Sequence, residues 1–233
     1  MIATRGGVEA FNYVSRRRRP LRRVAKLFAA PLYYLFESGQ FKSIVRARAV
    51  DRTGAPMPMF TYPAFDFLIS VEPHLRDAAV LEFGCGQSTK WFAPRVKSLV
   101  GVEKNAAFRE VLTREFASSP HMRFVGSELP FKVEGKFDIV VIDGEPRVEA
   151  GKFAAHAVAD DGIAIFDNSD IQSLTPIPEL FHSLGFARVD YFGYSPTGVR
   201  KQCTSIFFRD LKWFRLTNRV MPISANSHTE NLR

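Results

Sequence analysis

The sequence predicts an α/β fold built on a doubly wound, seven-stranded sheet that is mostly parallel and ends in an antiparallel hairpin. From residue 80 onward, short apolar segments alternate with segments of helical periodicity, an order typical of parallel strands covered by helices on both faces. The last two strand segments are separated by the short stretch YSPTGVRKQ, which cannot hold a helical crossover. We therefore expect these two strands to pair antiparallel.

The individual elements follow from composition and periodicity. Strands are expected over residues 80–83, 98–103, 122–125, 137–143, 162–166, 187–192 and 204–208. Helices are expected over residues 64–71, 88–95, 105–117, 147–159 and 174–184. The 233 residues, 46% of them hydrophobic, suffice for one packed domain with additional sequence at its ends. The expected regions are a basic amphipathic segment (1–50), a linker and helix (51–75), a ligand-binding domain (76–210) and a C-terminal tail (211–233).

The positive charge of the chain is concentrated at its N-terminus. The net charge is +8, and residues 1–30 hold eight basic residues and one acidic residue, whereas the remainder holds 24 and 23. Leu21, Val24, Ala25 and Phe28 recur at helical spacing, with basic residues on nearly the opposite side. This pattern predicts a short amphipathic helix with a cationic face.

Three interpretations of this segment remain open. Residues 16–36 fit contact with an anionic membrane surface, because cationic amphipathic helices bind anionic headgroups. An arginine-rich, acid-poor start also resembles an organellar targeting peptide, and the third alternative is an arm whose aromatic residues pack on the domain. The apolar run is too short to span a bilayer. Nucleic acid is disfavoured as a partner, because no aromatic platform accompanies the arginines.

The two cysteines indicate a reducing compartment. Cys85 lies in a glycine-rich turn, where a disulfide would obstruct a ligand, and Cys203 is its single potential partner. We therefore expect a cytoplasmic protein, which would be peripheral to a membrane if the N-terminal helix binds lipid.

The stretch VLEFGCGQST, residues 80–89, predicts a ligand-binding turn between a buried strand and a helix. Gly84 and Gly86 allow the backbone to turn tightly and to approach a ligand closely, and Ser88 and Thr89 suit the start of a helix. Strand–turn–helix units of this kind bind nucleotide-like ligands at the edge of an open α/β sheet.

Over residues 60–209 the chain resembles class I S-adenosylmethionine-dependent methyltransferases, which have a Rossmann-like fold. The resemblance rests on LEFGCGQST, GVEKN, RFVGSE, FDIVVIDG and GIAIFDNSD in this order, followed by the terminal hairpin. The turn and the C-terminal segment also resemble those of small bacterial methyltransferases with a GxGxST turn. The resemblance implies S-adenosylmethionine as the cofactor of residues 76–210. It also implies methyl transfer to a hydroxyl, carboxyl or amine of a small molecule, lipid or glycan.

The resemblance also implies which residues hold the cofactor. They are Glu82, Gly84, Cys85, Gly86 and Ser88 in and beside the turn, Glu103 after the second strand, Ser127 and Glu128 after the third, and Asp143 after the fourth. Glu103 would accept hydrogen bonds from both ribose hydroxyls, and Ser127 or Glu128 would contact the adenine. Ser88 stands at the third glycine position of the motif, which changes how closely the helix packs.

The candidate catalytic residues are Asp143, Asp167 and Asn168, at the ends of the fourth and fifth strands. They resemble, by type and position, the three oxygen ligands of a divalent cation in methyltransferases of the catechol O-methyltransferase type, which implies a Mg²⁺ site. A metal-free site that uses the same acids is the alternative. The lysine base of that type is missing here, and Arg147 stands near its place.

Three other functions compete with methyl transfer. An aminopropyltransferase-like enzyme shares the fold but would need further acids, and no matching acidic run follows Asp143. A membrane-docked, non-catalytic scaffold would not need an intact glycine turn or Glu103. A dinucleotide-dependent dehydrogenase usually has a third glycine where this chain has Ser88.

Overall fold

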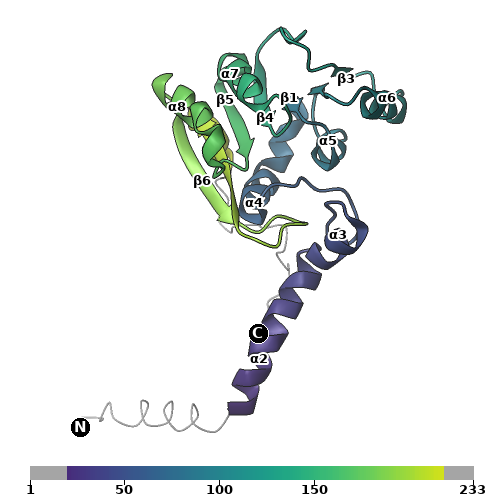
Figure 1. Cartoon of the computed structure of the whole chain (residues 1–233), viewed down its shortest axis with the longest axis vertical. Coiled ribbons are helices and arrows are strands. Elements are labelled where there is room, and N and C mark those ends of the chain that lie inside the picture. The colour runs from purple at the N-terminus through teal and green to yellow at the C-terminus, as the bar shows by residue number, and fades with distance from the viewer. Residues whose placement is uncertain (1–19, 218–233) are drawn as a thin grey trace, which may run out of the picture.

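The computed structural model describes residues 20–217, which form an α/β domain with an N-terminal helix projecting from it (Figure 1). The sheet has seven strands in the order β3-β2-β1-β4-β5-β7-β6. Strands β1 to β5 run parallel to one another, and β7 is antiparallel to both of its neighbours, β5 and β6. The predicted mostly parallel sheet with a terminal antiparallel hairpin is confirmed.

Apart from β5, the strand bounds lie close to those expected, whereas helices α3 and α9 were not expected. The strands are β1 (Ala79–Phe83), β2 (Ser98–Val102), β3 (Met122–Val125), β4 (Phe137–Ile142), β5 (Val158–Asp167), β6 (Ala187–Gly193) and β7 (Gln202–Phe208). The α-helices are α2 (Pro20–Glu37), α3 (Gln40–Arg46), α4 (Tyr62–Val71), α5 (Gln87–Phe92), α6 (Ala106–Glu115), α7 (Arg147–Ala157), α8 (Pro176–Ser183) and α9 (Lys212–Leu216). Short 3₁₀ helices cover η1 (Glu72–Asp77) and η2 (Gln172–Leu174).

Two apolar layers cover the sheet. One layer packs the sheet against α4, α5 and α9 through residues such as Phe65, Trp91 and Trp213. The other packs it against α7 and α8 through Ala154 and Phe181. Because the central strands are buried on both faces, they are continuously apolar, which is the pattern that identified them in the sequence.

Strand β5 is longer than expected and begins where a helix was expected to continue. Helix α7 ends at Ala157, and β5 starts at the next residue, Val158, whereas the sequence predicted a helix to residue 159 and a strand from 162. Asp160 and Asp161 lie in this exposed first part of β5. Their ion pairs with Arg209 and Lys212 have N–O distances of 2.9 and 2.7 Å. These contacts join residues distant in sequence, so local periodicity could not anticipate them.

The parallel register brings the carboxyl ends of five strands, β1 to β5, to one edge of the sheet. Phe83 at the end of β1 is aligned with Val102 of β2 and with Ile142 of β4. Asp167 at the end of β5 is aligned with Thr204 of the antiparallel strand β7. The loops that follow these strands, which contain the predicted site residues, therefore meet at this edge.

The C-terminal end of α2 attaches this helix to the domain. The Tyr34 ring meets the Tyr62 ring edge to face, with 5.9 Å between their centroids. At the start of α3, Gln40 Nε2 donates a hydrogen bond to the carbonyl oxygen of Gly198 in the hairpin loop, at 2.8 Å. Among residues 20–217 no helix is both long and apolar enough to cross a bilayer.

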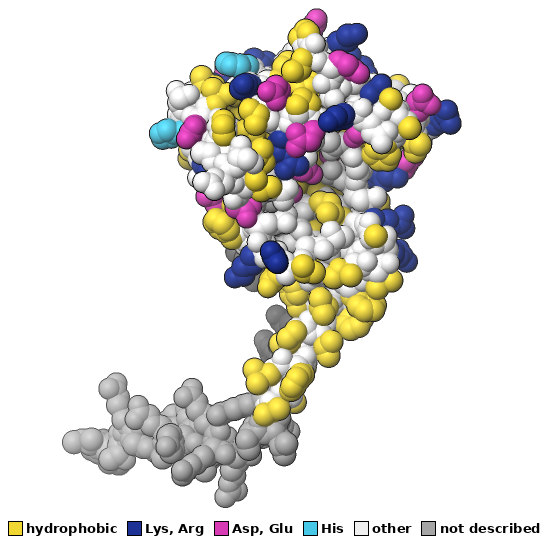
Figure 2. Space-filling model, viewed as in Figure 1, with side chains coloured by type: hydrophobic (Ala, Val, Ile, Leu, Met, Phe, Trp, Pro, Cys, Tyr) yellow, Lys and Arg dark blue, Asp and Glu magenta, His cyan; other side chains and the backbone are white. Residues whose placement is uncertain are grey.

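The rest of α2 extends away from the domain with its side chains exposed. Figure 2 shows apolar side chains gathered along α2 and over α3. Phe28, Tyr33 and Phe36 each leave more than half of their surface exposed, which does not fit the interpretation of an aromatic arm packed on the domain. Residues 1–19 of the expected basic segment and 218–233 of the expected tail lie outside the described residues.

Candidate active site

The glycine turn after β1 is held against the loop after β4. Gly84 has φ +87°, and a Cβ atom there would lie 2.6 Å from Gly144 Cα. The Gly84 N–H donates to Val102 O at 2.9 Å, and the Asp143 N–H donates to Phe83 O at 3.0 Å. The close contact of two backbones therefore requires glycine at position 84 and fixes where the turn lies relative to Asp143.

Gly86 leaves open space on the outer side of the same turn. A Cβ atom at Gly86 would meet no atom within 4 Å. The backbone N–H of Gly86 donates to Thr89 Oγ1 at 2.8 Å, and Thr89 Oγ1 in turn donates to Glu82 Oε2 at 2.5 Å. The turn thus presents accessible backbone, while its inner side is tied to the buried carboxylate.

Glu82 is fully buried and only half satisfied. Its Oε2 accepts from Thr89, but Oε1 has no hydrogen-bond partner within the described part of the chain. Burial raises the pKa of Glu82 to about 7 against the opposing effect of the Ser88 and Thr89 hydroxyls, and the negative charges of Asp143 and Glu103 raise it further. A buried carboxylate oxygen without a partner is costly, so this atom fits a ligand that supplies a positively charged or N–H donor.

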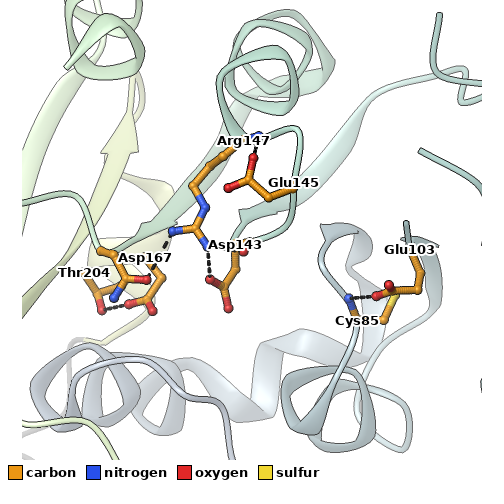
Figure 3. Close-up of polar contacts among 8 residues, drawn as sticks. Cys85, Glu103, Asp143, Glu145, Arg147, Asp167 and Thr204 are labelled. Atoms are coloured by element: carbon orange, nitrogen blue, oxygen red, sulfur yellow. Dashed lines mark hydrogen bonds and ion pairs between the residues drawn. The ribbon is translucent and has the colours of Figure 1, made fainter. Parts of the chain in front are cut away.

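Glu103 ends β2 directly beside the glycine turn. Its Oε2 accepts from the Cys85 N–H at 3.2 Å, and its Oε1 accepts from the Asn105 N–H at 2.7 Å (Figure 3). The Cys85 side chain packs on β2 next to Gly101, and burial raises the pKa of its thiol. Glu103 therefore has a fixed orientation and retains lone pairs for a ligand.

The remaining cofactor candidates lie on or near the same edge. Ser88 is buried in the first turn of α5. Ser127 and Glu128 follow β3, and the Glu128 carboxylate folds back over Gly126, where a Cβ atom would collide with it. The fold therefore brings the predicted cofactor residues to the loops and helix start after β1, β2, β3 and β4.

A second cluster centres on Arg147 in the first turn of α7. Its Nη2 donates to Asp143 Oδ1 at 2.9 Å and to the Asp143 carbonyl oxygen, and its Nη1 donates to Asn168 Oδ1 at 3.2 Å. Asp167 Oδ1 accepts from Thr204 Oγ1 at 2.6 Å. Figure 3 shows Arg147 reaching toward Asp143 with Asp167 and Thr204 beside them, while Cys85 and Glu103 lie across the same edge.

The sequence placed Asp143, Asp167 and Asn168 together but missed the role of Arg147. The available signal was its spacing, because Asp143 and Arg147 are four residues apart at the start of a helix. Asn168 has φ +54°, a left-handed conformation that asparagine tolerates, and this turns its side chain toward Arg147. Asp170, the next acid along the chain, accepts from the Cys203 N–H at 3.0 Å and so stabilises the start of β7.

Burial raises the pKa of both aspartates, but their surroundings differ. The guanidinium of Arg147 opposes the rise for Asp143, whose side chain is 27% exposed. Asp167 is almost fully buried, and the negative charge of Asp143 raises its pKa further, although the Thr204 hydroxyl opposes this. Both carboxyls therefore hold a proton to higher pH than a free aspartate does, and the two titrate as a coupled pair.

These residues do not fit the expected Mg²⁺ ion. The Arg147 guanidinium already bonds oxygen atoms of Asp143 and Asn168, two of the three expected ligands. The third, Asp167, gives one oxygen to Thr204. Within residues 20–217, no three His, Cys, Asp or Glu side chains are grouped so that they could hold a metal ion. A fixed organic cation stands where the resemblance implied a metal.

Known proteins with a similar fold include several methyltransferases. A precorrin-6Y C5,15-methyltransferase from Geobacter metallireducens aligns with 62% of this chain and 87% of its own, at 11% identity and a TM-score of 0.49. A methyltransferase from Pyrococcus furiosus aligns with 79% of this chain and 98% of its own, at 20% identity and a TM-score of 0.47. The N-methyltransferase NodS from Bradyrhizobium japonicum, in complex with S-adenosyl-L-homocysteine, aligns with 72% of this chain and 97% of its own, at 17% identity and a TM-score of 0.46.

No protein-family model matches the sequence, and no curated protein matches it. All three structural likenesses are below 25% identity and a TM-score of 0.5, so the function of this chain has to follow from its own residues. These likenesses concern the fold alone.

Proposed function

We propose that this chain is an S-adenosylmethionine-dependent methyltransferase. The observation that carries the proposal is the pairing of two different sites on one sheet edge. An open glycine turn with an unpartnered Glu82 oxygen and an oriented Glu103 lies at β1 and β2. A buried acid–arginine cluster lies at the ends of β4 and β5. The first suits a charged nucleoside ligand, and the second suits the orientation of a nucleophile next to it.

We call the glycine turn with Glu82 and Glu103 the cofactor half of the site, and each predicted cofactor residue has a role in it. Glu82 Oε1 accepts a hydrogen bond from the amino group of the cofactor, and Glu103 accepts hydrogen bonds from the ribose hydroxyls. Gly84, Cys85 and Gly86 supply a backbone that a ligand can approach closely, with Ser88 behind them. Ser127 and Glu128 after β3 contact the adenine, and Asp143 borders the reactive end. When bound, S-adenosylmethionine supplies a sulfonium methyl group that is transferred by in-line displacement.

We call the acid–arginine cluster at the ends of β4 and β5 the acceptor half of the site; it orients the methyl acceptor and supplies a base. Asp143 is the more exposed of the two acids, so it is the one that takes the proton of a hydroxyl or amine acceptor. Arg147 holds Asp143 and Asn168 in place and supplies the positive charge. Asp167, fixed by Thr204, keeps its side chain beside the pair. A carboxyl acceptor would need no base and would instead use the Arg147 charge.

Isothermal titration with S-adenosylmethionine tests the proposal. The wild-type chain should bind, and Glu103→Ala should bind at least about tenfold more weakly, because two hydrogen bonds to a charged acceptor are lost. Glu110→Ala is the matched control, since Glu110 is an exposed glutamate of α6 that pairs with Arg114 on the surface. Addition of Mg²⁺ should leave both affinities unchanged.

The same titration separates the competing functions. Preference for decarboxylated S-adenosylmethionine would indicate the aminopropyltransferase alternative, and binding of a dinucleotide instead would indicate a dehydrogenase. Absence of binding to all three would leave the non-catalytic scaffold. If the wild type binds, release of S-adenosylhomocysteine in the presence of hydroxyl, carboxyl and amine acceptors identifies the acceptor class.

A further inference from the structure

Residues 24–34 of helix α2 are mostly apolar and are exposed on every side of the helix. Every residue from 24 to 34 is exposed, and this stretch contains one charged residue, Lys26. The largest exposures are those of Leu27 at 72% and Phe28 at 69%, with Leu32 at 54%. A helix that packs on its own domain would hide one stripe of such residues. Contiguous exposed apolar surface of this kind marks an interaction site.

The apolar surface continues from α2 onto α3. Phe36 and Phe41 contact each other, with 4.9 Å between ring centroids, and both remain about half exposed. Ile44 and Val45 extend the surface along α3, and Val45 is 69% exposed. Figure 2 shows this apolar surface running from the projecting helix to the base of the domain. The two helices therefore form one surface, which we call the α2–α3 surface.

Basic residues border the α2–α3 surface at both ends. Residues 16–48 contain ten Lys and Arg residues and a single acid, Glu37. Arg22 and Arg23 lie in the first part of α2, and Arg46 and Arg48 are exposed at the end of α3. Apolar side chains flanked by cations, with tyrosines in between, are the composition of segments that sit in the headgroup region of anionic bilayers.

We propose that the α2–α3 surface docks the protein onto an anionic membrane. The apolar stretch of residues 24–36 is about 20 Å long at the α-helical rise, shorter than the roughly 30 Å of a hydrocarbon core. The helix therefore enters one leaflet without crossing the bilayer. The apolar side chains insert between lipids, and the flanking arginines and lysines bind anionic headgroups.

The charge distribution favours a membrane over a second copy of the chain. Two α2 helices paired in parallel would bring their arginine-rich ends together, and an antiparallel pair would place each such end beside apolar residues. Both arrangements leave the cations uncompensated, whereas an anionic bilayer compensates the cations and the apolar side chains together.

Docking would also bring the candidate active site near the lipid. Tyr62 at the start of α4 meets Tyr34 of α2, and the neighbouring Thr61 N–H donates to Thr204 Oγ1 at 3.0 Å. Thr204 itself donates to Asp167. The anchor thus attaches to the sheet edge that carries the acids, which favours a lipid or other amphiphile as the methyl acceptor. This last point rests on the proposed function, whereas the docking does not.

Co-sedimentation of the full chain with vesicles tests the docking. The wild type should bind phosphatidylcholine vesicles that contain phosphatidylglycerol, bind pure phosphatidylcholine more weakly, and lose binding as salt rises. Leu27→Ser combined with Phe28→Ser should weaken partitioning at least about tenfold, because two large apolar side chains no longer insert. Arg22→Glu combined with Arg23→Glu should remove the preference for the anionic lipid.

The matched control is Val111→Ser combined with Leu211→Ser, two exposed apolar residues on α6 and before α9. It should bind vesicles as the wild type does. Circular dichroism and S-adenosylmethionine titration show whether each variant is folded, so a failure of docking is distinguishable from a failure of the proposed function.

Three results would overturn the docking proposal. The first is a wild type that stays in solution with anionic vesicles. The second is a dimer in sedimentation velocity that the Leu27/Phe28 variant dissociates, which would make a second copy the occupant. The third is vesicle binding that appears only after deletion of residues 218–233. This would mean that the C-terminal tail of the same chain, and not a membrane, occupies the α2–α3 surface.

Discussion

The two halves of the candidate active site differ in how their polar groups are satisfied. In the cofactor half, Glu82 Oε1 is buried without a partner and the outer side of Gly86 faces open space. In the acceptor half, Asp143, Asn168 and Asp167 are each bonded to another residue of the cluster or to Thr204, although Arg147 Nε is also buried without a partner within the described residues. The first half thus has a carboxylate oxygen left over for a ligand, whereas in the second Arg147 and Thr204 hold the acids and the amide in place before any acceptor arrives. Such preformed geometry suits the alignment of a nucleophile.

The largest expected effect comes from Gly84, which joins the two halves. Gly84→Ala should abolish cofactor binding and lower the free energy of unfolding by more than the about 1–3 kcal/mol expected for a strained backbone alone, because its Cβ would strike Gly144. Thermal unfolding and cofactor titration measure both changes.

Gly135→Ala is the control for this comparison. Gly135 also has a positive φ, +101°, but a Cβ there would meet nothing within 4 Å. It should show the backbone strain without the collision and keep cofactor affinity. Equal losses of stability for the two variants would mean that the contact with Gly144 is not what restricts position 84.

Removal of Arg147 tests whether the acceptor half is self-supporting. Arg147→Ala should lower the free energy of unfolding by about 2 kcal/mol, since the partly buried Asp143 and Asn168 lose a charged donor. The loss should be greatest at neutral pH and shrink in acid, because without the guanidinium the pKa of Asp143 rises and its protonated form is tolerated. Denaturant unfolding across pH measures this.

Methyl transfer to an acceptor found by screening should fall about 100-fold or more in Arg147→Ala. Arg147→Lys should recover the charge but not both hydrogen bonds, and so give an intermediate rate. Wild-type activity that disappears with a chelator and returns with Mg²⁺ would show that a metal, and not Arg147, is the cation of this half.

A smaller, pH-dependent effect is expected in the cofactor half. The pKa of Glu82 is raised to about 7 by burial, so the unliganded chain binds a proton there that the unfolded chain has released. The contribution of Glu82 to the free energy of unfolding is fully present below its pKa in the unfolded chain, near 4.5. It is lost as the pH rises through its pKa in the folded chain, about 7. Glu82→Gln should flatten this part of the stability profile, as measured by denaturant unfolding at pH 4 to 8.

Cofactor affinity should change in the opposite direction. If Glu82 binds an amino group as a carboxylate, affinity should rise with pH up to about 7 and level off above it, by about tenfold in all between pH 6 and 8, with proton release on binding. Glu82→Gln should remove this dependence while leaving the open turn intact. An affinity that is independent of pH in the wild type would mean that Glu82 stays neutral in the complex.

The sequence by itself determined the alternation of strands and helices, the antiparallel hairpin, the glycine turn and the acids at strand ends. These depend on local signals, namely continuous apolar runs, the special conformations of glycine, and the rule that parallel strands end at one edge. The resemblance to a methyltransferase family added the expectation of a cofactor, which stays a prediction.

Only the tertiary structure decided three other features. It showed Arg147 between Asp143 and Asn168, the unpartnered oxygen of Glu82, and the exposure of residues 24–34 of α2 on all sides. Each depends on which side chains meet across distant segments, or fail to meet, and no local pattern contains that information. For the same reason the Mg²⁺ expectation, drawn from residue types at strand ends, did not include the guanidinium that bonds the same oxygen atoms.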